Sequence, residues 1–160
     1  MRNQKTIAFQ GVPGAYSHLS CQAFCPDWQA VAYKSFSGML RAVQSGECSS
    51  AMVPVENSTA GRVADIHRML PDSGLHIIAE HFQPVNHQLL GIRGSKLSDI
   101  KEAYSHEQGL AQCRKKLEKL GIEPMIHSDT AGAARDIANW NDHTKAAIAS
   151  NLAAQVYGLD

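Results

Sequence analysis

Four short stretches of the sequence combine residue types and spacings that could carry chemistry. The first spans residues 11–18 and reads GVPGAYSH. Its two glycines permit a tight turn, and the helix that we predict after it offers backbone N–H groups to an anion. The stretch matches neither the Gly-x-Gly-x-x-Gly pattern nor a Walker loop, so it gives little support to nucleotide binding. The alternative is an ordinary strand-to-helix turn, which this stretch taken alone favours.

The second stretch, PVENSTAG at residues 54–61, follows a predicted strand and precedes a predicted helix. Four consecutive side chains there can bind a ligand or the backbone: Glu56, Asn57, Ser58 and Thr59. Ligands of open α/β sheets bind at the carboxyl ends of the strands. Helix capping is the alternative, but a cap needs one such residue rather than four. We therefore predict a binding or catalytic role for this stretch.

The third stretch, YSHEQGLAQC at residues 104–113, occupies the matching position in the second half of the chain. Ser105 lies at a predicted strand end, and Gln108 and Gln112 are four residues apart, so they share one helix face. Capping by Ser105 with Glu107 or Gln108 is an equally good interpretation of the stretch alone. Its symmetry with the second stretch favours binding, and we expect both to face one cleft between two lobes.

The fourth stretch, DTAGAA at residues 129–134, has a structural interpretation. Asp129 is typical of a helix N-cap, and the small residues after it suit close packing. Other groups that suggest chemistry are also interpreted structurally. Cys21 and Cys25 have no second pair at zinc spacing, and the histidines of the middle region have no carboxylates at ligand spacing. We expect no metal, no cofactor, and four reduced thiols.

The elements that position these stretches alternate between strand and helix. Predicted strands cover residues 6–9, 30–33, 50–55, 103–105, 123–127 and 145–150, and predicted helices cover residues 16–24, 36–43, 63–70, 107–120, 130–140 and 152–157. Two further strand-like runs, 75–82 and 86–92, lie between the halves. This order predicts an α/β fold with two lobes, about 1–80 and 81–160, each a β-α-β-α-β unit with a mostly parallel sheet.

Composition limits the possible partners. The 160 residues carry 15 Lys plus Arg against 15 Asp plus Glu, for a formal charge of zero. Nucleic acids and anionic membranes therefore lack a broad electrostatic attraction to this chain. No window approaches about 18 uninterrupted apolar residues, so no transmembrane helix is predicted. Residues 1–6 are polar and resemble no signal peptide, so we expect a cytoplasmic protein.

Taken together, these stretches resemble the prephenate dehydratase family. The matching segments follow the family's order at residues 11–19, 54–61, 87–90, 105–113, 129–134 and 147–159. The resemblance implies a two-lobed fold similar to type II periplasmic binding proteins, and conversion of prephenate to phenylpyruvate, carbon dioxide and water in phenylalanine biosynthesis. On this basis we assign carboxylate binding to backbone and side-chain donors of Gly14, Ala15, Tyr16, Ser105 and Gln108, with Gln112 reaching in from the second lobe. The residues expected to orient the ring and its leaving group are Asn57, Ser58 and Thr59, while Glu56 is expected to be structural.

The sequence departs from the family pattern at two places. Glu107 stands where the family usually has proline, and both residues suit a first helical turn. Family members also continue to a Thr-Arg-Phe motif, whose threonine is regarded as essential, and many carry an ACT-type phenylalanine-sensing domain. We therefore expect a domain that is incomplete at its C-terminus and has little activity alone. Arogenate dehydratase and a non-catalytic module that binds small anions are the alternatives, and a homodimer is left open.

Overall fold

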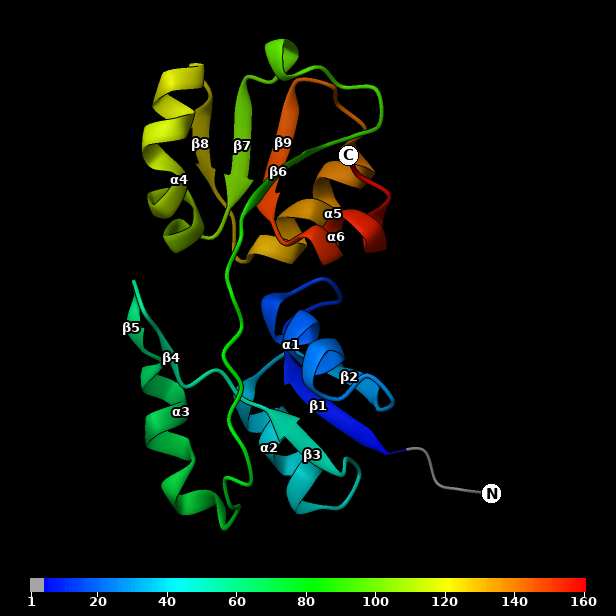
Figure 1. Ribbon diagram of the computed structural model, residues 1–160, viewed down its shortest axis with the longest axis vertical. Coiled ribbons are helices and arrows are strands. Elements are labelled where there is room, and N and C mark those ends of the chain that lie inside the picture. Colours follow the sequence, from blue (N-terminus) through cyan, green and yellow to red (C-terminus); the bar gives the residue numbers. More distant parts are fainter. Residues whose placement is uncertain (1–4) are drawn as a thin grey trace. The chain divides into compact units, whose positions relative to one another are not determined.

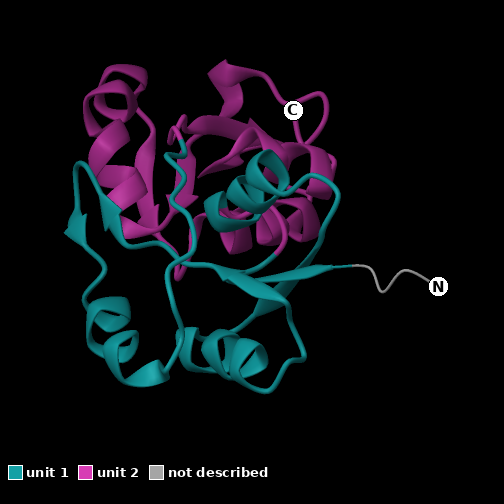
Figure 2. Ribbon diagram, turned by 60° about the horizontal axis from the view of Figure 1, so that its bottom comes forward, with its two compact units in different colours: residues 1–12, 16–83 teal, residues 13–15, 84–160 magenta. Residues whose placement is uncertain are grey.

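The computed structural model describes residues 5–160, so residues 1–4 of the polar N-terminal stretch lie outside the described residues. The chain divides into two compact units (Figure 2). Unit 1 contains the residues up to Val12 together with 16–83, and unit 2 contains Pro13–Ala15 together with Pro84–Asp160. The tripeptide at 13–15 therefore groups with the second unit although both of its flanking segments belong to the first.

Unit 1 is built on a three-stranded parallel sheet in the order β2-β1-β3 (Figure 1). Its strands are β1 (Thr6–Gln10), β2 (Gln29–Tyr33) and β3 (Ser50–Met52), and its helices are α1 (Tyr16–Phe24), α2 (Phe36–Gln44) and α3 (Ala64–Met69). Ile7, Ala8 and Phe9 of the central strand are all buried. A continuous apolar run is what a parallel strand covered on both faces requires.

Unit 2 is built on a four-stranded sheet in the order β6-β9-β7-β8, in which only β6 runs antiparallel. Its strands are β6 (Gln88–Gly91), β7 (Glu102–Ser105), β8 (Glu123–Ile126) and β9 (Lys145–Ala149), and its helices are α4 (Glu107–Leu120), α5 (Thr130–Trp140) and α6 (Asn151–Tyr157). Short 3-10 turns lie at Pro71–Ser73 in unit 1 and Leu97–Asp99 in unit 2. The predicted α/β class with mostly parallel sheets is confirmed.

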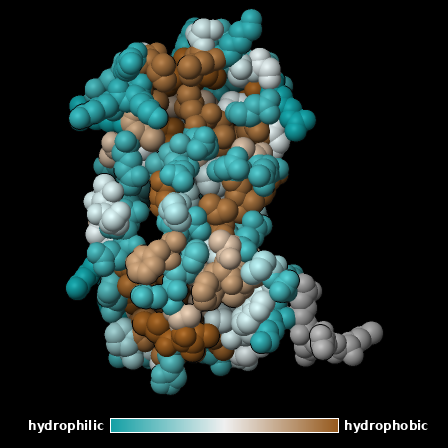
Figure 3. All heavy atoms as spheres, viewed as in Figure 1, coloured by the Kyte–Doolittle hydropathy of each residue, from teal (hydrophilic) through white to brown (hydrophobic). Residues whose placement is uncertain are grey.

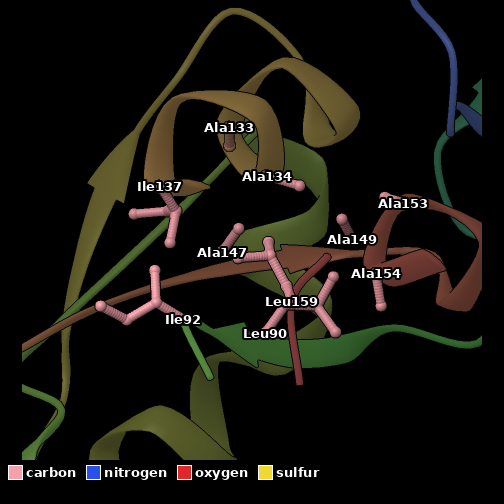
Figure 4. Packing of buried hydrophobic residues seen from close by; sticks show 10 residues of the cluster. All are labelled: Leu90, Ile92, Ala133, Ala134, Ile137, Ala147, Ala149, Ala153, Ala154 and Leu159. Atoms are coloured by element: carbon pink, nitrogen blue, oxygen red, sulfur yellow. The ribbon is translucent and has the colours of Figure 1, made fainter. Parts of the chain in front are cut away.

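One of the two hydrophobic clusters in unit 2 is made largely of small side chains (Figure 4). Alanines of α5, β9 and α6 pack against four larger residues, and the cluster comprises Ala133, Ala134, Ala147, Ala149, Ala153, Ala154, Leu90, Ile92, Ile137 and Leu159. Small side chains let a helix approach a sheet closely, so α5 packs directly against β9, and α6 packs against α5. The end of the chain joins the same core, because Ile92 forms an isolated bridge with Leu159.

The helices predicted at 16–24, 107–120 and 130–140 have the predicted bounds, but the strand predicted at 50–55 is too long. It ends at Met52, two residues before Pro54, which has no N–H to donate to a sheet. Residues beyond it form an unpredicted hairpin of two short strands, β4 (Glu56–Asn57) and β5 (Gly61–Arg62). Pro54–Gly61 is therefore not a simple strand-to-helix loop.

The strand predicted at 75–82 is wrong, because the structure assigns no strand there. Leu75 packs against the core of unit 1, but the apolar side chains after it face solvent, with Ile77, Ile78 and Phe82 exposed at 72, 80 and 83%. The run that suggested a strand therefore forms none, and most of its side chains are not buried. Figure 3 shows hydrophobic atoms reaching the surface on the face that it draws. No helix among the described residues is both long and apolar enough to cross a membrane.

Candidate functional site

In unit 1 the predicted catalytic residues lie on the β4–β5 hairpin, where Asn57 shapes the turn. Its Oδ1 accepts hydrogen bonds from the N–H groups of Thr59 (2.9 Å) and Ala60 (3.0 Å). This is the local pattern of an Asx turn. Its Nδ2 amide group has no hydrogen-bond partner among residues 5–160. The Asn57 side chain is therefore held in place while its amide group can donate a hydrogen bond to a ligand. Ser58 and Thr59 beside it are exposed.

The capping interpretation of this stretch is wrong, because α3 begins only at Ala64. Its N-cap position is held by Val63, whose side chain makes no cap hydrogen bond. The hairpin is closed instead by pairing of Asn57 with Gly61, which has φ 81°, a conformation that favours glycine. Glu56 pairs with Arg62 across the two strands and is exposed.

In unit 2 Ser105 ends β7 and is fully buried. Its hydroxyl donates a 2.7 Å hydrogen bond to the carbonyl of Ile148 on the neighbouring strand β9. The proton of this hydroxyl therefore forms a hydrogen bond between the two strands and is not available to a ligand. The alternative that Ser105 caps α4 is wrong, because His106 holds the N-cap position and its Nδ1 accepts from Gln108 N at 3.3 Å.

Gln112 makes a side-chain contact that the sequence did not indicate. Its Oε1 lies 3.1 Å from Nε2 of His87, just before β6. His87 is half-buried, and burial lowers its pKa while the contact with Gln112 opposes that change. A neutral imidazole bound to a fixed amide is a well-oriented polar group. His87 therefore joins the candidate site; it stood in the matching segment 87–90, but nothing near it in sequence indicated a partner.

Gly109 of α4 lies close to both Ser105 and His87. A Cβ at this position would lie 2.8 Å from Ser105 Oγ and 3.6 Å from Cε1 of His87. The first turns of α4 therefore pass directly over the end of β7 and beside His87. The structure places Ser105, Gln112 and His87 in one cluster, while the side chain of Gln108 is exposed on the same helix.

The remaining predicted residues, Gly14, Ala15 and Tyr16, lie where the chain enters α1. Gly14 is buried, has φ 89°, and belongs to unit 2 together with Ala15, whereas Tyr16 begins α1 in unit 1. Within unit 2 the turn contacts Ser150 and Tyr157 at the two ends of α6. These two residues were also missed, because they lie more than 130 positions away in the sequence.

The fourth stretch has the structural role predicted for it. Asp129 is the N-cap of α5 and accepts a 2.6 Å hydrogen bond from the N–H of Gly132. Beside it, Nε2 of His127 lies 3.0 Å from Oδ2 of Asp136. The pKa of Asp136 is lowered, first by its hydrogen bond from Arg135 and then by His127. Across residues 5–160 no group of three or more His, Cys, Asp or Glu could hold a metal ion.

Comparison with known proteins identifies relatives along the whole chain. The family model described as "Prephenate dehydratase" matches residues 7–160. A "Bifunctional N-acyl-homoserine lactone acylase/prephenate dehydratase" of Komagataeibacter europaeus is 45% identical over 160 residues, which is 100% of this chain and 57% of that protein. The "Arogenate dehydratase/prephenate dehydratase 1, chloroplastic" of Arabidopsis thaliana is 40% identical over 96% of this chain and 39% of its own length.

Solved structures give the same result for the fold. A chain described as "GqqA- a novel type of quorum quenching acylases" has a TM-score of 0.92 and 46% identity, covering 98% of this chain and 57% of that chain. The prephenate dehydratase of Arthrobacter aurescens in complex with L-Phe has a TM-score of 0.89 and 28% identity, covering 97% of this chain and 53% of that one. The present chain thus spans about half the length of these relatives, or less.

Proposed function

The chain belongs to the prephenate dehydratase family, and from this premise we propose that it carries substrate-binding and catalytic residues of a carbon–oxygen lyase. The reaction converts prephenate to phenylpyruvate, carbon dioxide and water, a step of phenylalanine biosynthesis. The observation that carries the proposal is the family match over residues 7–160. We further propose that unit 1 and unit 2 are the two lobes of one catalytic domain.

This reaction requires no strong nucleophile from the protein. The bond between the ring and its carboxylate breaks, the electron pair enters the ring, and the ring hydroxyl leaves with a proton as water. Formation of the aromatic ring supplies the driving force. The protein must bind the dianion and donate a hydrogen bond to the departing hydroxyl. Neutral donors suit this task, because they stabilise a carboxylate without burying an unpaired cation.

Carboxylate binding is assigned to unit 2 and the start of α1. The backbone turn of Gly14, Ala15 and Tyr16 would donate N–H groups, and Gln108 and Gln112 would donate side-chain amides. With its Oε1 held by His87, Gln112 would present its amide nitrogen in a defined direction. Ser105 is not given a direct contact with a carboxylate, because its hydroxyl proton is donated to Ile148 and the remaining oxygen can only accept. We propose instead that Ser105 affects the position of α4, since its Oγ lies directly beneath Gly109.

Contact with the departing hydroxyl is assigned to the hairpin of unit 1. The Asx turn fixes Asn57 Oδ1, so the amide nitrogen of the same side chain becomes a positioned donor. Ser58 and Thr59 add exposed hydroxyls beside it. We therefore propose Asn57 as the residue that hydrogen-bonds the leaving group, with Ser58 and Thr59 orienting the ring.

Arogenate is the alternative substrate, because it differs from prephenate only in carrying an amine in place of the side-chain ketone. Plant relatives are named either for arogenate alone or for both substrates. Incubation of the protein with each compound, followed by measurement of phenylpyruvate or phenylalanine, separates the two. Formation of neither product by the full-length protein, together with retained binding of prephenate, would support the non-catalytic module that binds small anions and would overturn the enzymatic proposal.

A second candidate activity is hydrolysis of N-acyl-homoserine lactones. It is supported by the 45% identity, across all 160 residues, to a protein whose name includes that activity. Chromatographic detection of released homoserine lactone after incubation with an N-acyl-homoserine lactone tests it. Absence of release at a protein concentration that turns over prephenate would eliminate this candidate.

The cellular location, the oligomeric state and the cofactor requirement of the protein are further parts of the proposed function. We propose a cytoplasmic protein, supported by four cysteines that are all free, two of them buried. Light scattering of the purified protein would test for the homodimer that the family resemblance suggests. We propose no cofactor or metal, and chelator treatment that leaves turnover unchanged would agree with this.

A further inference from the structure

One face of α6 contacts the turn to which carboxylate binding is assigned. The residues on this face are Ser150, Ala153 and Tyr157, which are spaced at i, i+3 and i+7 and so lie along one side of a helix. We propose that Ser150 and Tyr157 are positioning residues, which hold the Pro13–Ala15 turn and affect substrate binding through it. This inference rests on the proposed function of the turn.

Two hydrogen bonds fix consecutive carbonyl groups of the turn. Ser150 Oγ donates to the carbonyl of Gly14 at 2.6 Å, and Tyr157 OH donates to the carbonyl of Pro13 at 2.7 Å. Both peptide units are trans. In a planar trans peptide the N–H points opposite to the carbonyl, so the N–H groups of Gly14 and Ala15 point away from α6. The two side chains thus orient the backbone donors that the proposed function uses.

The packing at Gly14 is equally restrictive. A Cβ there would lie 2.8 Å from the Cα of Ala153, which is closer than real side chains approach a backbone atom. Gly14 also has φ 89°, which L side chains rarely adopt. The turn therefore sits against α6 only because Gly14 has no side chain and Ala153 has a small one. The hydrogen bond from Ser150 to Gly14 is buried, whereas the one from Tyr157 to Pro13 is exposed.

The helix that holds the turn is itself firmly anchored. Ala153 and Ala154 pack on Ala149 of β9 and Ala134 of α5 within the core of unit 2 (Figure 4). Burial raises the pKa of Tyr157, so its hydroxyl stays protonated and able to donate at neutral pH. A helix packed into the core, with donors at both ends of one face, is suited to orienting a backbone turn.

The direct test is Tyr157→Phe, which removes one hydroxyl and keeps the ring. Tyr104→Phe is a matched control, because it removes a hydroxyl that donates to Glu102 elsewhere in unit 2. For Tyr157→Phe we expect the KM for prephenate to rise about 3- to 10-fold, the effect of one lost hydrogen bond, with kcat changed less than twofold. Amide hydrogen exchange at residues 14–16 should accelerate by a similar factor, with exchange in α6 unchanged. Unchanged exchange and an unchanged KM would overturn the inference.

Ser150 requires a separate comparison, because its Oγ also accepts the N–H of Ala153 and caps α6. Ser150→Thr retains both interactions and should retain KM, whereas Ser150→Ala should raise KM. If Ser150→Thr raises KM as much as Ser150→Ala does, the hydroxyl is not the positioning group.

Gly14→Ala separates failure of the inference from failure of the proposed function. If Gly14→Ala leaves KM unchanged, the turn does not bind substrate, and the proposed function of the turn fails. If Gly14→Ala raises KM but Tyr157→Phe does not, the turn binds substrate and the inference alone fails. Hydrogen exchange at residues 14–16 tests the positioning role even in the absence of turnover.

Discussion

Replacement of Asn57 probes the proposed leaving-group contact, and two substitutions divide its contributions. Asn57→Ala removes both the Oδ1 that orders the turn and the amide donor. Asn57→Asp keeps oxygens that can accept from the N–H groups of Thr59 and Ala60, but it has no N–H to donate. The pair therefore separates the structural effect of the turn from the donor.

The magnitudes follow from these contacts. The two turn hydrogen bonds lie in an exposed hairpin, so Asn57→Ala should lower the free energy of unfolding by only about 1 kcal/mol. Loss of one positioned donor to a developing charge costs about 100-fold or more in kcat. We expect both variants to lose that much, and Asn57→Asp at least as much as Asn57→Ala, because its carboxylate would repel the departing hydroxide.

The assay is phenylpyruvate formation from prephenate, combined with urea unfolding of each variant. Asn139→Ala is a suitable control, since it removes an exposed asparagine from the last turn of α5. A kcat for Asn57→Asp within threefold of the unmodified protein would refute the donor role. A large loss of stability in Asn57→Ala would instead indicate that the hairpin matters mainly for folding.

Three further predictions concern single residues. Gly109→Ala should destabilise the protein by about 1–3 kcal/mol in urea unfolding, because its Cβ would lie 2.8 Å from the buried Ser105 Oγ; equal stability would contradict the close packing of α4. The pKa of Asp136 in the folded protein is held below its ordinary value of 3.8 by Arg135 and His127. The stabilisation from these contacts should therefore be present above about pH 4 and be lost as the pH falls through the lowered pKa. Asp136→Asn should flatten the dependence of the free energy of unfolding on pH in that range, and an unaltered dependence would argue against the ion pair. Burial, followed by the neighbouring Cys25, raises the pKa of Cys21 to about 12, so Cys21 should resist a thiol reagent at pH 8 until urea unfolds the protein, and rapid labelling of the folded protein would contradict this.

Local patterns predicted the helices well, because their signals are short in range. Apolar spacing and capping residues placed 16–24, 107–120 and 130–140 at the observed bounds. The β4–β5 hairpin was missed because its strands have only two residues each, too few for a periodic signal. The strand predicted at 75–82 failed for the opposite reason, since an apolar run does not reveal whether a neighbouring strand is present.

The candidate site was only partly predictable for a related reason. Residue types and strand ends identified Asn57, Gln108 and Gln112. The partners that decide their chemistry come from distant segments, as with Gln112 and His87. The donation by Ser105 to Ile148 spans 43 positions, and that by Tyr157 to Pro13 spans 144. Hydrogen bonds between such distant residues are determined by the topology of the fold and cannot be recognised from the local sequence.

We propose that neutral donors of this chain promote the loss of carbon dioxide and hydroxide from prephenate in the same turnover. Prephenate labelled with ¹³C in its ring carboxylate should release labelled carbon dioxide and phenylpyruvate in a 1:1 ratio, and Asn57→Asp should slow both equally. Release of carbon dioxide without phenylpyruvate, or equal rates with and without the Asn57 amide, would contradict the proposed role of these donors.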